Sequence, residues 1–135
     1  MNNGFSLLEL LIVLILIGIL SVAAFSSYQH ITLKARRLDA QTTLLNYHTQ
    51  LQKCFMTEHN YTTCIQQFNL EASQNSLENF YKIQAIQIEI TDYTLQALAQ
   101  GTQQQDESCY RFTLDHFLQR LAYDQNGNTQ PHCWY

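Results

Sequence analysis

Four cysteines are the residues best suited to covalent chemistry in this sequence, at positions 54, 64, 109 and 133. An even number of cysteines in a small exported domain is typical of a disulfide framework, and four cysteines allow three pairings. We predict a Cys54–Cys64 bond, which would close a short loop where a helix ends. We also predict a Cys109–Cys133 bond, which would tie a strand to a chain end that would otherwise fray. By the loop-entropy relation the second bond contributes roughly 3–4 kcal/mol, a large share of a small domain's stability.

Two other uses of the cysteines compete with disulfides. Cys54, His59 and Cys64 lie close together in the sequence, and His132-Cys133 could complete a set of four zinc ligands. Structural zinc sites usually show tighter cysteine spacing than this, so disulfides are favoured. A cysteine nucleophile is also disfavoured, because no cysteine lies at a predicted helix start beside a basic residue that would lower its pKa. We therefore expect no enzymatic activity, no bound metal and no cofactor.

A short segment near the end of the chain could hold calcium. Residues 124–128 alternate oxygen-bearing side chains around Gly127. A full calcium loop has about twelve residues and a distal bidentate glutamate, which is missing here. Asn126-Gly127 is also a strong turn dipeptide between strands. We predict a hairpin turn, with calcium binding as the alternative.

One carboxylate, Glu9, lies inside an apolar run from Phe5 to Tyr28. As a helix this run would be about 36 Å long, enough to cross a hydrocarbon core of about 30 Å. A charge in such a span costs on the order of 3 kcal/mol and usually marks function. If the chain is cut before Phe5, the new α-amine lies about one helical turn from the Glu9 carboxylate and could pair with it. The α-amine of a neighbouring subunit could pair with Glu9 equally well. The alternative is an ordinary secretory signal cut after Ala23, which the uncharged leader and the long apolar run disfavour.

The residues around this carboxylate resemble a known signal. Gly4-Phe5-Ser6-Leu7-Leu8-Glu9-Leu10, followed by the Leu/Ile/Val run, resembles the class III signal of type IV prepilins and pseudopilins. The resemblance implies that a prepilin peptidase cuts after Gly4 and methylates the new N-terminal Phe5. It also implies that Glu9 is the carboxylate that guides assembly. At the other end of the chain, the region from Cys109 to the closing Cys133-Trp134 resembles PilE-like type IVa minor pilins, whose disulfide-bounded region typically ends in Cys-Trp.

This resemblance implies a domain organisation and a set of partners. Residues 1–4 would be the leader peptide, residues 5–28 the transmembrane and assembly half of a helix, and residues 29–135 the extracytoplasmic globular domain. The partners would be other pilin subunits through the N-terminal helix, the prepilin peptidase and the pilus assembly machinery. The protein would lie in the bacterial inner membrane as a single-pass precursor and then in the pilus at the cell surface.

The elements that position these residues follow from periodicity. From Tyr28 to Phe55 there is no Gly or Pro, and apolar residues recur at helical spacing. This pattern predicts one helix from Phe5 to about Met56, with a face that covers a sheet. The predicted apolar stripe comprises Ile31, Ala35, Leu38, Leu44 or Leu45, Tyr47, Leu51 and Phe55, and the polar residues between them, Arg37, Asp39 and Gln41 among them, take the other positions.

A change of period further along predicts strands. Residues 82–90 alternate apolar and polar side chains, and residues 93–98 form their antiparallel partner across a turn at Thr91-Asp92. We expect a third strand over 109–114, a short fourth over 121–123, and a polar loop over 101–107. Residues 65–81 form a connection with a helical turn around 71–79. The fold class is α+β: a long N-terminal helix packed on a roughly four-stranded antiparallel sheet, the lollipop shape of pilins.

Composition limits the function further. The 135 residues carry 7 Lys and Arg against 11 Asp and Glu, and after residue 53 the only cations are Lys82, Arg111 and Arg120. We therefore expect no nucleic-acid partner, because binding phosphate needs clustered cations. The expected function is that of a minor pilin, a structural subunit of a type IV pilus with roles in pilus biogenesis, adhesion or twitching motility. The alternatives are a pseudopilin of type II secretion or of DNA-uptake machinery, and a soluble periplasmic domain released by an ordinary signal peptidase.

Overall fold

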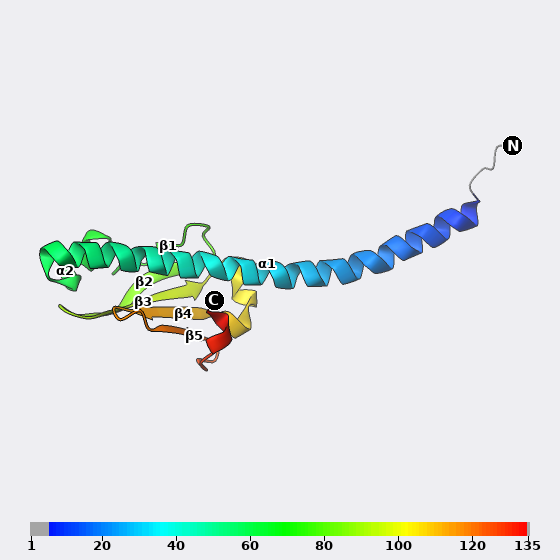
Figure 1. The fold of residues 1–135 in the computed structure, drawn as a ribbon. Coiled ribbons are helices and arrows are strands. Elements are labelled where there is room, and N and C mark those ends of the chain that lie inside the picture. The colour runs from blue at the N-terminus through cyan, green and yellow to red at the C-terminus, as the bar shows by residue number, and fades with distance from the viewer. Residues whose placement is uncertain (1–5, 135) are drawn as a thin grey trace. The chain divides into compact units, whose positions relative to one another are not determined.

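The computed structural model describes residues 6–134, except the side chains of residues 23–26. The chain divides after Thr32 into two compact units, the second of which begins at Leu33. Figure 1 shows the order of the elements along the chain, with helix α1 first, then helix α2 and the strands.

Helix α1 (Leu7–Glu58) is a single element of 52 residues, which confirms the predicted long helix. In the part of α1 that belongs to the first unit, the large apolar side chains from Leu7 to Val22 are all more than two-fifths exposed. The hydroxyl of Ser21 donates to the carbonyl oxygen of Ile17 (2.7 Å), so this polar group is satisfied within the helix itself. The first unit is therefore a helix that is apolar around its whole circumference and is not covered by other residues of that unit.

The second half of α1 buries one face, in part a different face from the predicted one. Ala40, Leu44 and Leu51 are fully buried, as the stripe predicted for the two leucines. The prediction is wrong for the first turns of the stripe, because Ala35 and Leu38 are exposed. Ile31, in the first unit, is exposed as well.

Three polar residues that the prediction placed outside the apolar stripe, Arg37, Asp39 and Gln41, are buried instead. Arg37 donates two hydrogen bonds to Asp106, from Nε to Oδ2 (2.7 Å) and from Nη2 to Oδ1 (2.9 Å), and both side chains are only about 5% exposed. The Gln41 amide donates to the backbone carbonyl of Cys133 (2.8 Å). Burying a charge or an amide without a hydrogen-bond partner is costly, so these partners allow the Arg37 and Gln41 side chains to be buried.

Asp39 is the third buried polar residue of this helix. Its carboxylate accepts hydrogen bonds from the Ser76 hydroxyl and from the backbone N–H groups of Glu78 (3.1 Å) and Phe80 (3.3 Å). Ser76 in turn accepts from the backbone N–H of Tyr81 (2.9 Å). One carboxylate thus fixes the segment that leads into the sheet.

The connection between α1 and the sheet differs from the prediction. It contains helix α2 (Tyr61–Gln67), whose first turn is capped by Asn60: the Oδ1 atom accepts from the backbone N–H groups of Thr62 (2.9 Å) and Thr63 (3.4 Å). The predicted helical turn around 71–79 is wrong. That stretch holds instead a two-residue strand, β1 (Gln74–Asn75).

Within residues 6–134 the sheet has five strands in the order β1-β2-β3-β4-β5, each antiparallel to its neighbours. The α+β architecture is confirmed, and β1 is the strand that periodicity did not predict. Residues 101–109 form two short 3-10 helices in place of the predicted polar loop. The remaining elements are β2 (Tyr81–Ile88), β3 (Tyr93–Ala99), η1 (Gly101–Gln105), η2 (Glu107–Cys109), β4 (Arg111–Asp115), β5 (Arg120–Tyr123) and η3 (Pro131–Cys133).

The core lies between the second half of α1 and one face of this sheet. Alternate residues of β2 point into it, and Tyr81 and Ile83 are fully buried there. Tyr81 meets Phe112 of β4 edge to face, with ring centroids 5.8 Å apart. Each fully buried side chain of this size stabilises the fold by about 1.5–3 kcal/mol.

Candidate assembly helix and disulfide-bounded region

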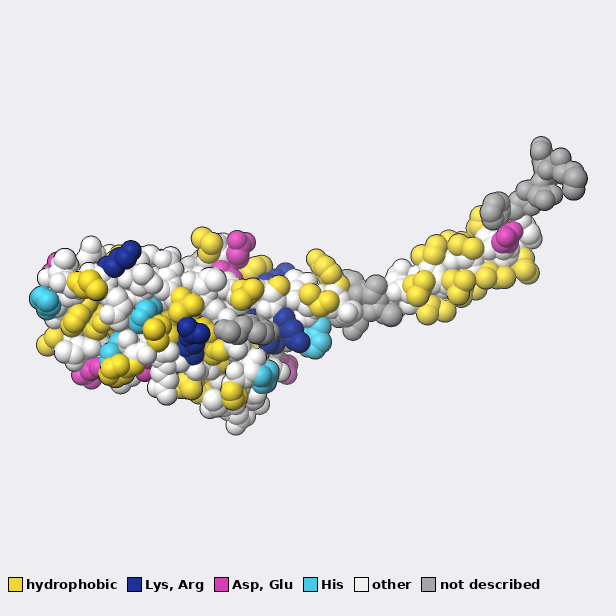
Figure 2. Space-filling view, in the orientation of Figure 1, with side chains coloured by type: hydrophobic (Ala, Val, Ile, Leu, Met, Phe, Trp, Pro, Cys, Tyr) yellow, Lys and Arg dark blue, Asp and Glu magenta, His cyan; other side chains and the backbone are white. Residues whose placement is uncertain are grey.

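Glu9 lies in the first turn of α1 with its side chain exposed. It is the only Asp, Glu, Lys or Arg before Lys34, and in Figure 2 one magenta side chain interrupts the yellow surface of the apolar segment. A carboxylate near a helix N-terminus is stabilised by the positive end of the helix dipole. No cation of the described residues lies within ion-pair distance of it.

The two residues of the predicted cleavage site, Gly4 and Phe5, lie outside the described residues. The cut between them and the methylation of Phe5 stay predictions.

The apolar surface around Glu9 is long enough to cross a membrane by length and composition. An apolar surface of this extent needs lipid or other apolar helices around it, since exposed patches of even a few hundred Å² are rare on soluble monomers.

The disulfides join the pairs Cys54–Cys64 and Cys109–Cys133, with Cα atoms 5.9 Å and 5.7 Å apart. The first bond links the last turns of α1 to α2. The second links η2, just before β4, to η3 near the chain end. Each bond therefore fastens a segment that few backbone hydrogen bonds of the sheet hold in place.

The cysteines that could bind zinc are all joined in these two disulfides. Cys109, His132 and Cys133 bring their ligand atoms within 4.8 Å of one another, but both sulfurs belong to the same disulfide. Zinc binds thiolates, so a metal centre here would require the bond to be reduced first. His59 lies beside the other disulfide in the sequence and packs its ring edge-on against Phe55.

The Cys-Trp end is held on the sheet. The indole Nε1 of Trp134 donates to the carbonyl oxygen of Leu121 (2.8 Å), and its ring meets Phe112 edge to face at 5.6 Å. The guanidinium of Arg120 lies over the indole, 5.7 Å from the ring centroid. Cys133 and Trp134 are thus held in place by a disulfide, a hydrogen bond and an aromatic contact.

The Asp124 loop is a turn whose carboxylate is used within the loop. Asp124 Oδ1 accepts from the backbone N–H groups of Asn126 (2.9 Å) and Asn128 (2.8 Å). Its Oδ2 accepts from the side-chain amides of Asn128 (2.8 Å) and Gln130 (3.2 Å). The Asn128 side chain, foremost among these donors, lowers the pKa of Asp124. Gly127 has φ +89°, a conformation that favours glycine, as the predicted Asn-Gly turn requires.

Three residues of α1, Arg37, Asp39 and Gln41, bond to the segments around the sheet, and the sequence pattern did not predict this role. Their residue types gave no signal for burial, because charged and amide side chains on a helix are usually exposed to solvent. Their partners, Asp106 for Arg37, Ser76 for Asp39 and the Cys133 carbonyl for Gln41, all lie far away along the chain.

An apolar helix half with one carboxylate, continuous with a helix that packs on an antiparallel sheet stapled by two disulfides, defines a type IV pilin. Residues 26–113 match the family model described as type IV minor pilin ComP, DNA uptake sequence receptor, and residues 1–25 match the prokaryotic N-terminal methylation motif. The chain belongs to this family of type IV minor pilins.

Solved pilin structures share the fold. The non-core minor pilin PilV of Neisseria meningitidis is similar with a TM-score of 0.58 and 17% identity, over 74% of this chain and 95% of that one. A type IV pilin from Shewanella oneidensis is similar with a TM-score of 0.50 and 19% identity, over 76% and 98% of the two chains. At these identities the likeness shows the fold alone. No curated protein sequence matches the chain significantly.

Proposed function

We propose that the chain is made as a precursor, cut between Gly4 and Phe5, methylated on Phe5, and built into a type IV pilus as a minor subunit. The observation that carries this proposal is the exposed apolar half of α1 with Glu9 as its one carboxylate. The match of residues 1–25 to the methylation motif supports the processing step. The role is structural, and we assign the protein no catalytic activity.

Glu9 would act by pairing with the α-amine of Phe5 in a neighbouring subunit. A charge inside a membrane span is costly, so the carboxylate gains when an opposite charge reaches it. The cut before Phe5 creates such a charge and at the same time ties assembly to processing. Other pilin subunits, the prepilin peptidase and the assembly machinery are the partners that this mechanism requires.

The protein would be anchored in the inner membrane by the first unit before assembly, with the sheet outside the cytoplasm. The two disulfides support this side of the membrane, because such bonds persist in oxidising compartments. After assembly the sheet would be displayed at the cell surface.

The N-terminus of the exported protein tests the processing step. We expect intact-mass and N-terminal sequencing to find N-methylated Phe5 as the first residue. Gly4→Val should leave an uncut precursor, because a side chain beside the scissile bond would block the peptidase, whereas the leader variant Asn2→Ala should be cut normally. A mature chain that begins at Ala24 would contradict the proposal and point to an ordinary signal peptidase.

Reception of DNA during uptake is a second candidate function, and the family description is what favours it. The sheet places Lys82, Leu98, Arg111 and Tyr123 side by side across β2, β3, β4 and β5. The Arg111 guanidinium lies 4.4 Å from the centroid of the Tyr123 ring, an arrangement that also suits a nucleic-acid surface.

The charge balance weighs against this second function. All seven Lys and Arg lie after Leu33, but so do ten of the eleven acidic residues. On the face that Figure 2 shows, the Lys and Arg side chains form separate groups. The expectation of no nucleic-acid partner therefore stays a prediction.

Titration of the full-length chain with duplex DNA at increasing salt tests the second function. If the chain is a DNA receptor, affinity should fall steeply with salt, and Lys82→Gln or Arg111→Gln should weaken it at each salt concentration. Lys53→Gln on α1 is the matched control. Binding that is absent at low salt would remove this function and leave pilus assembly untouched.

A further inference from the structure

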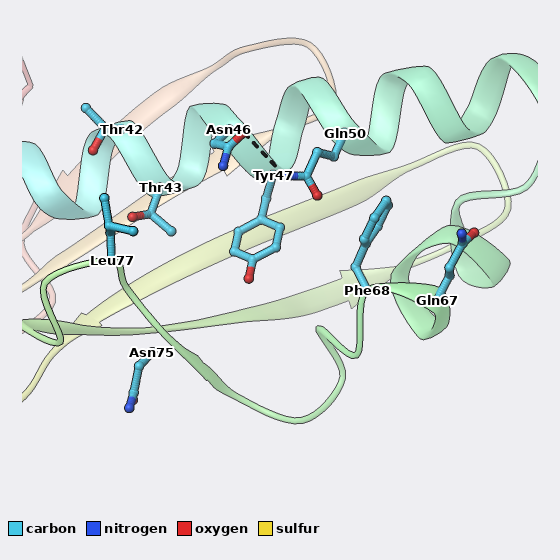
Figure 3. Close-up of a pocket in the computed structure, with 9 residues that line it drawn as sticks. All are labelled: Thr42, Thr43, Asn46, Tyr47, Gln50, Gln67, Phe68, Asn75 and Leu77. Carbon is cyan, nitrogen blue, oxygen red and sulfur yellow. Dashed lines mark hydrogen bonds between the residues drawn. The ribbon is translucent and has the colours of Figure 1, made fainter.

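A groove of about 640 Å³ opens beside the second half of α1. Figure 3 shows its walls: α1 on one side, the end of α2 on another, and the segment that carries β1 on the third. Tyr47 points from α1 into the space, and Phe68 borders it from the end of α2. The volume is within the range of about 300–1,000 Å³ that small-molecule sites have.

The lining is polar and carries no charge. Among the described residues that border the groove there is no Lys, Arg, Asp, Glu or His, and most of the side chains are amides or hydroxyls. A charged ligand such as a phosphate, a nucleic acid or a carboxylate would find no countercharge here. An apolar ligand would leave the amides without partners, which costs about 1–3 kcal/mol for each buried group.

Several of these polar groups have open hydrogen-bonding positions. Gln50 Nε2 donates to Asn46 Oδ1 (3.3 Å), which leaves the Gln50 carbonyl and the Asn46 amino group free for a ligand. The hydroxyls of Tyr47 and Thr43 make no hydrogen bond within residues 6–134. The groove therefore offers donors and acceptors side by side, on a helix that keeps their spacing fixed.

We propose that this groove binds a neutral carbohydrate. Each sugar hydroxyl both donates and accepts a hydrogen bond, and the Asn46–Gln50 pair presents one donor and one acceptor at adjacent positions. The apolar face of a sugar ring would lie against the rings of Tyr47 and Phe68, which supply a rigid apolar surface. A neutral polyol matches the uncharged, amide-rich lining in a way that DNA, lipid headgroups and apolar peptides do not.

Saturation-transfer NMR on the mature full-length chain tests this proposal, in a detergent that has no sugar headgroup. The probes are maltotriose and the trimer of N-acetylglucosamine, with a heparin-derived disaccharide as the charged comparator. We expect saturable transfer from at least one neutral probe. The affinity should stay the same between about 0.05 and about 0.5 M salt, because no charge takes part.

Variants locate the binding. Asn46→Ala combined with Gln50→Ala should weaken binding at least tenfold, and Tyr47→Phe should weaken it by a smaller factor. Thr49→Ala is the matched control, because Thr49 is exposed on the same helix outside the groove and its hydroxyl bonds only within the helix. An unchanged Trp134 fluorescence spectrum shows that a variant is folded.

Three results would overturn the proposal. The first is no transfer from either neutral probe, and the second is transfer from the charged comparator alone. The third is neutral binding that the double variant leaves intact. Cross-links from the groove to a second copy of the chain in pili, together with no sugar binding, would show that the groove is a contact between subunits.

Discussion

The buried pair between Arg37 and Asp106 should be the strongest single polar contact between α1 and the segment that joins β3 to β4. It has two hydrogen bonds, of 2.7 Å and 2.9 Å, and both side chains are almost fully buried. Asp106→Ala removes the carboxylate and leaves the guanidinium in its buried position without that countercharge. Removing one partner of a buried pair costs about 3–5 kcal/mol, and we expect a loss of unfolding free energy in this range.

A double variant separates the cost of leaving a buried charge without its countercharge from a simple loss of packing. Arg37→Met combined with Asp106→Leu replaces both charges by apolar side chains of similar size. Such replacements are often neutral or stabilising, so the double variant should be more stable than Asp106→Ala alone. The matched control is Asp92→Ala at the more exposed His116–Asp92 pair (3.0 Å), which should cost less than about 1 kcal/mol.

The assay is urea unfolding of the full-length chain in detergent micelles, followed by Trp134 fluorescence. Trp134 packs against Phe112 on the sheet, so its signal reports the second unit. A loss below about 1 kcal/mol for Asp106→Ala would refute the reasoning, because the pair would then behave as an exposed one. A double variant as unstable as Asp106→Ala would also refute it, since the loss would then come from packing.

Two further predictions concern the disulfides and the pH dependence of stability. By loop length, replacing both Cys109 and Cys133 by Ser should lower the free energy of unfolding by about 3.5 kcal/mol, and replacing both Cys54 and Cys64 by Ser should lower it by about 2.8 kcal/mol. A larger loss in urea unfolding for the Cys54 and Cys64 variant would contradict this order. Burial lowers the pKa of His48, whose Nδ1 lies 2.7 Å from the Tyr93 hydroxyl. The folded state then binds fewer protons than the unfolded state, so the stability that the neutral ring contributes is complete above about pH 6.5 and falls as the pH drops below it. Melting temperatures between pH 8 and pH 5 should show this decline, and it should be smaller in His48→Gln; the same decline in that variant would assign the effect to other groups.

Much of the fold could be predicted because its signals are local. Apolar residues at helical spacing, with no Gly or Pro from Tyr28 to Phe55, predicted the long helix, and alternation over residues 82–90 predicted β2. β1 could not be predicted in this way, because two residues carry no period. It exists because Gln74 and Asn75 pair with Ile83 and Lys82, and because Asp39 holds the segment after it through Ser76.

The buried face of α1 shows where local patterns fail. Leu38 fits the apolar stripe but is exposed, while Arg37 and Asp39 on either side of it are buried. Their burial depends on Asp106 and Ser76, which lie 69 and 37 residues away in the sequence. The residues of the helix alone therefore cannot indicate that Arg37 and Asp39 are buried. The groove beside Tyr47 is likewise assembled from three segments and has no signature in any one of them.

We propose that the chain enters a pilus through the apolar half of α1, with Glu9 as the charge that guides it. The most direct measurement is the ratio of this protein in sheared pili to that in the membrane fraction, for wild type, Glu9→Ala and Glu9→Gln. Ser21→Ala is the control, because its hydroxyl bonds only within the same helix. We predict that both Glu9 variants stay inserted and stable in the membrane while their share in pili falls, since neither can pair with the α-amine of Phe5. An unchanged ratio in both variants would contradict the account and leave apolar packing alone to drive assembly.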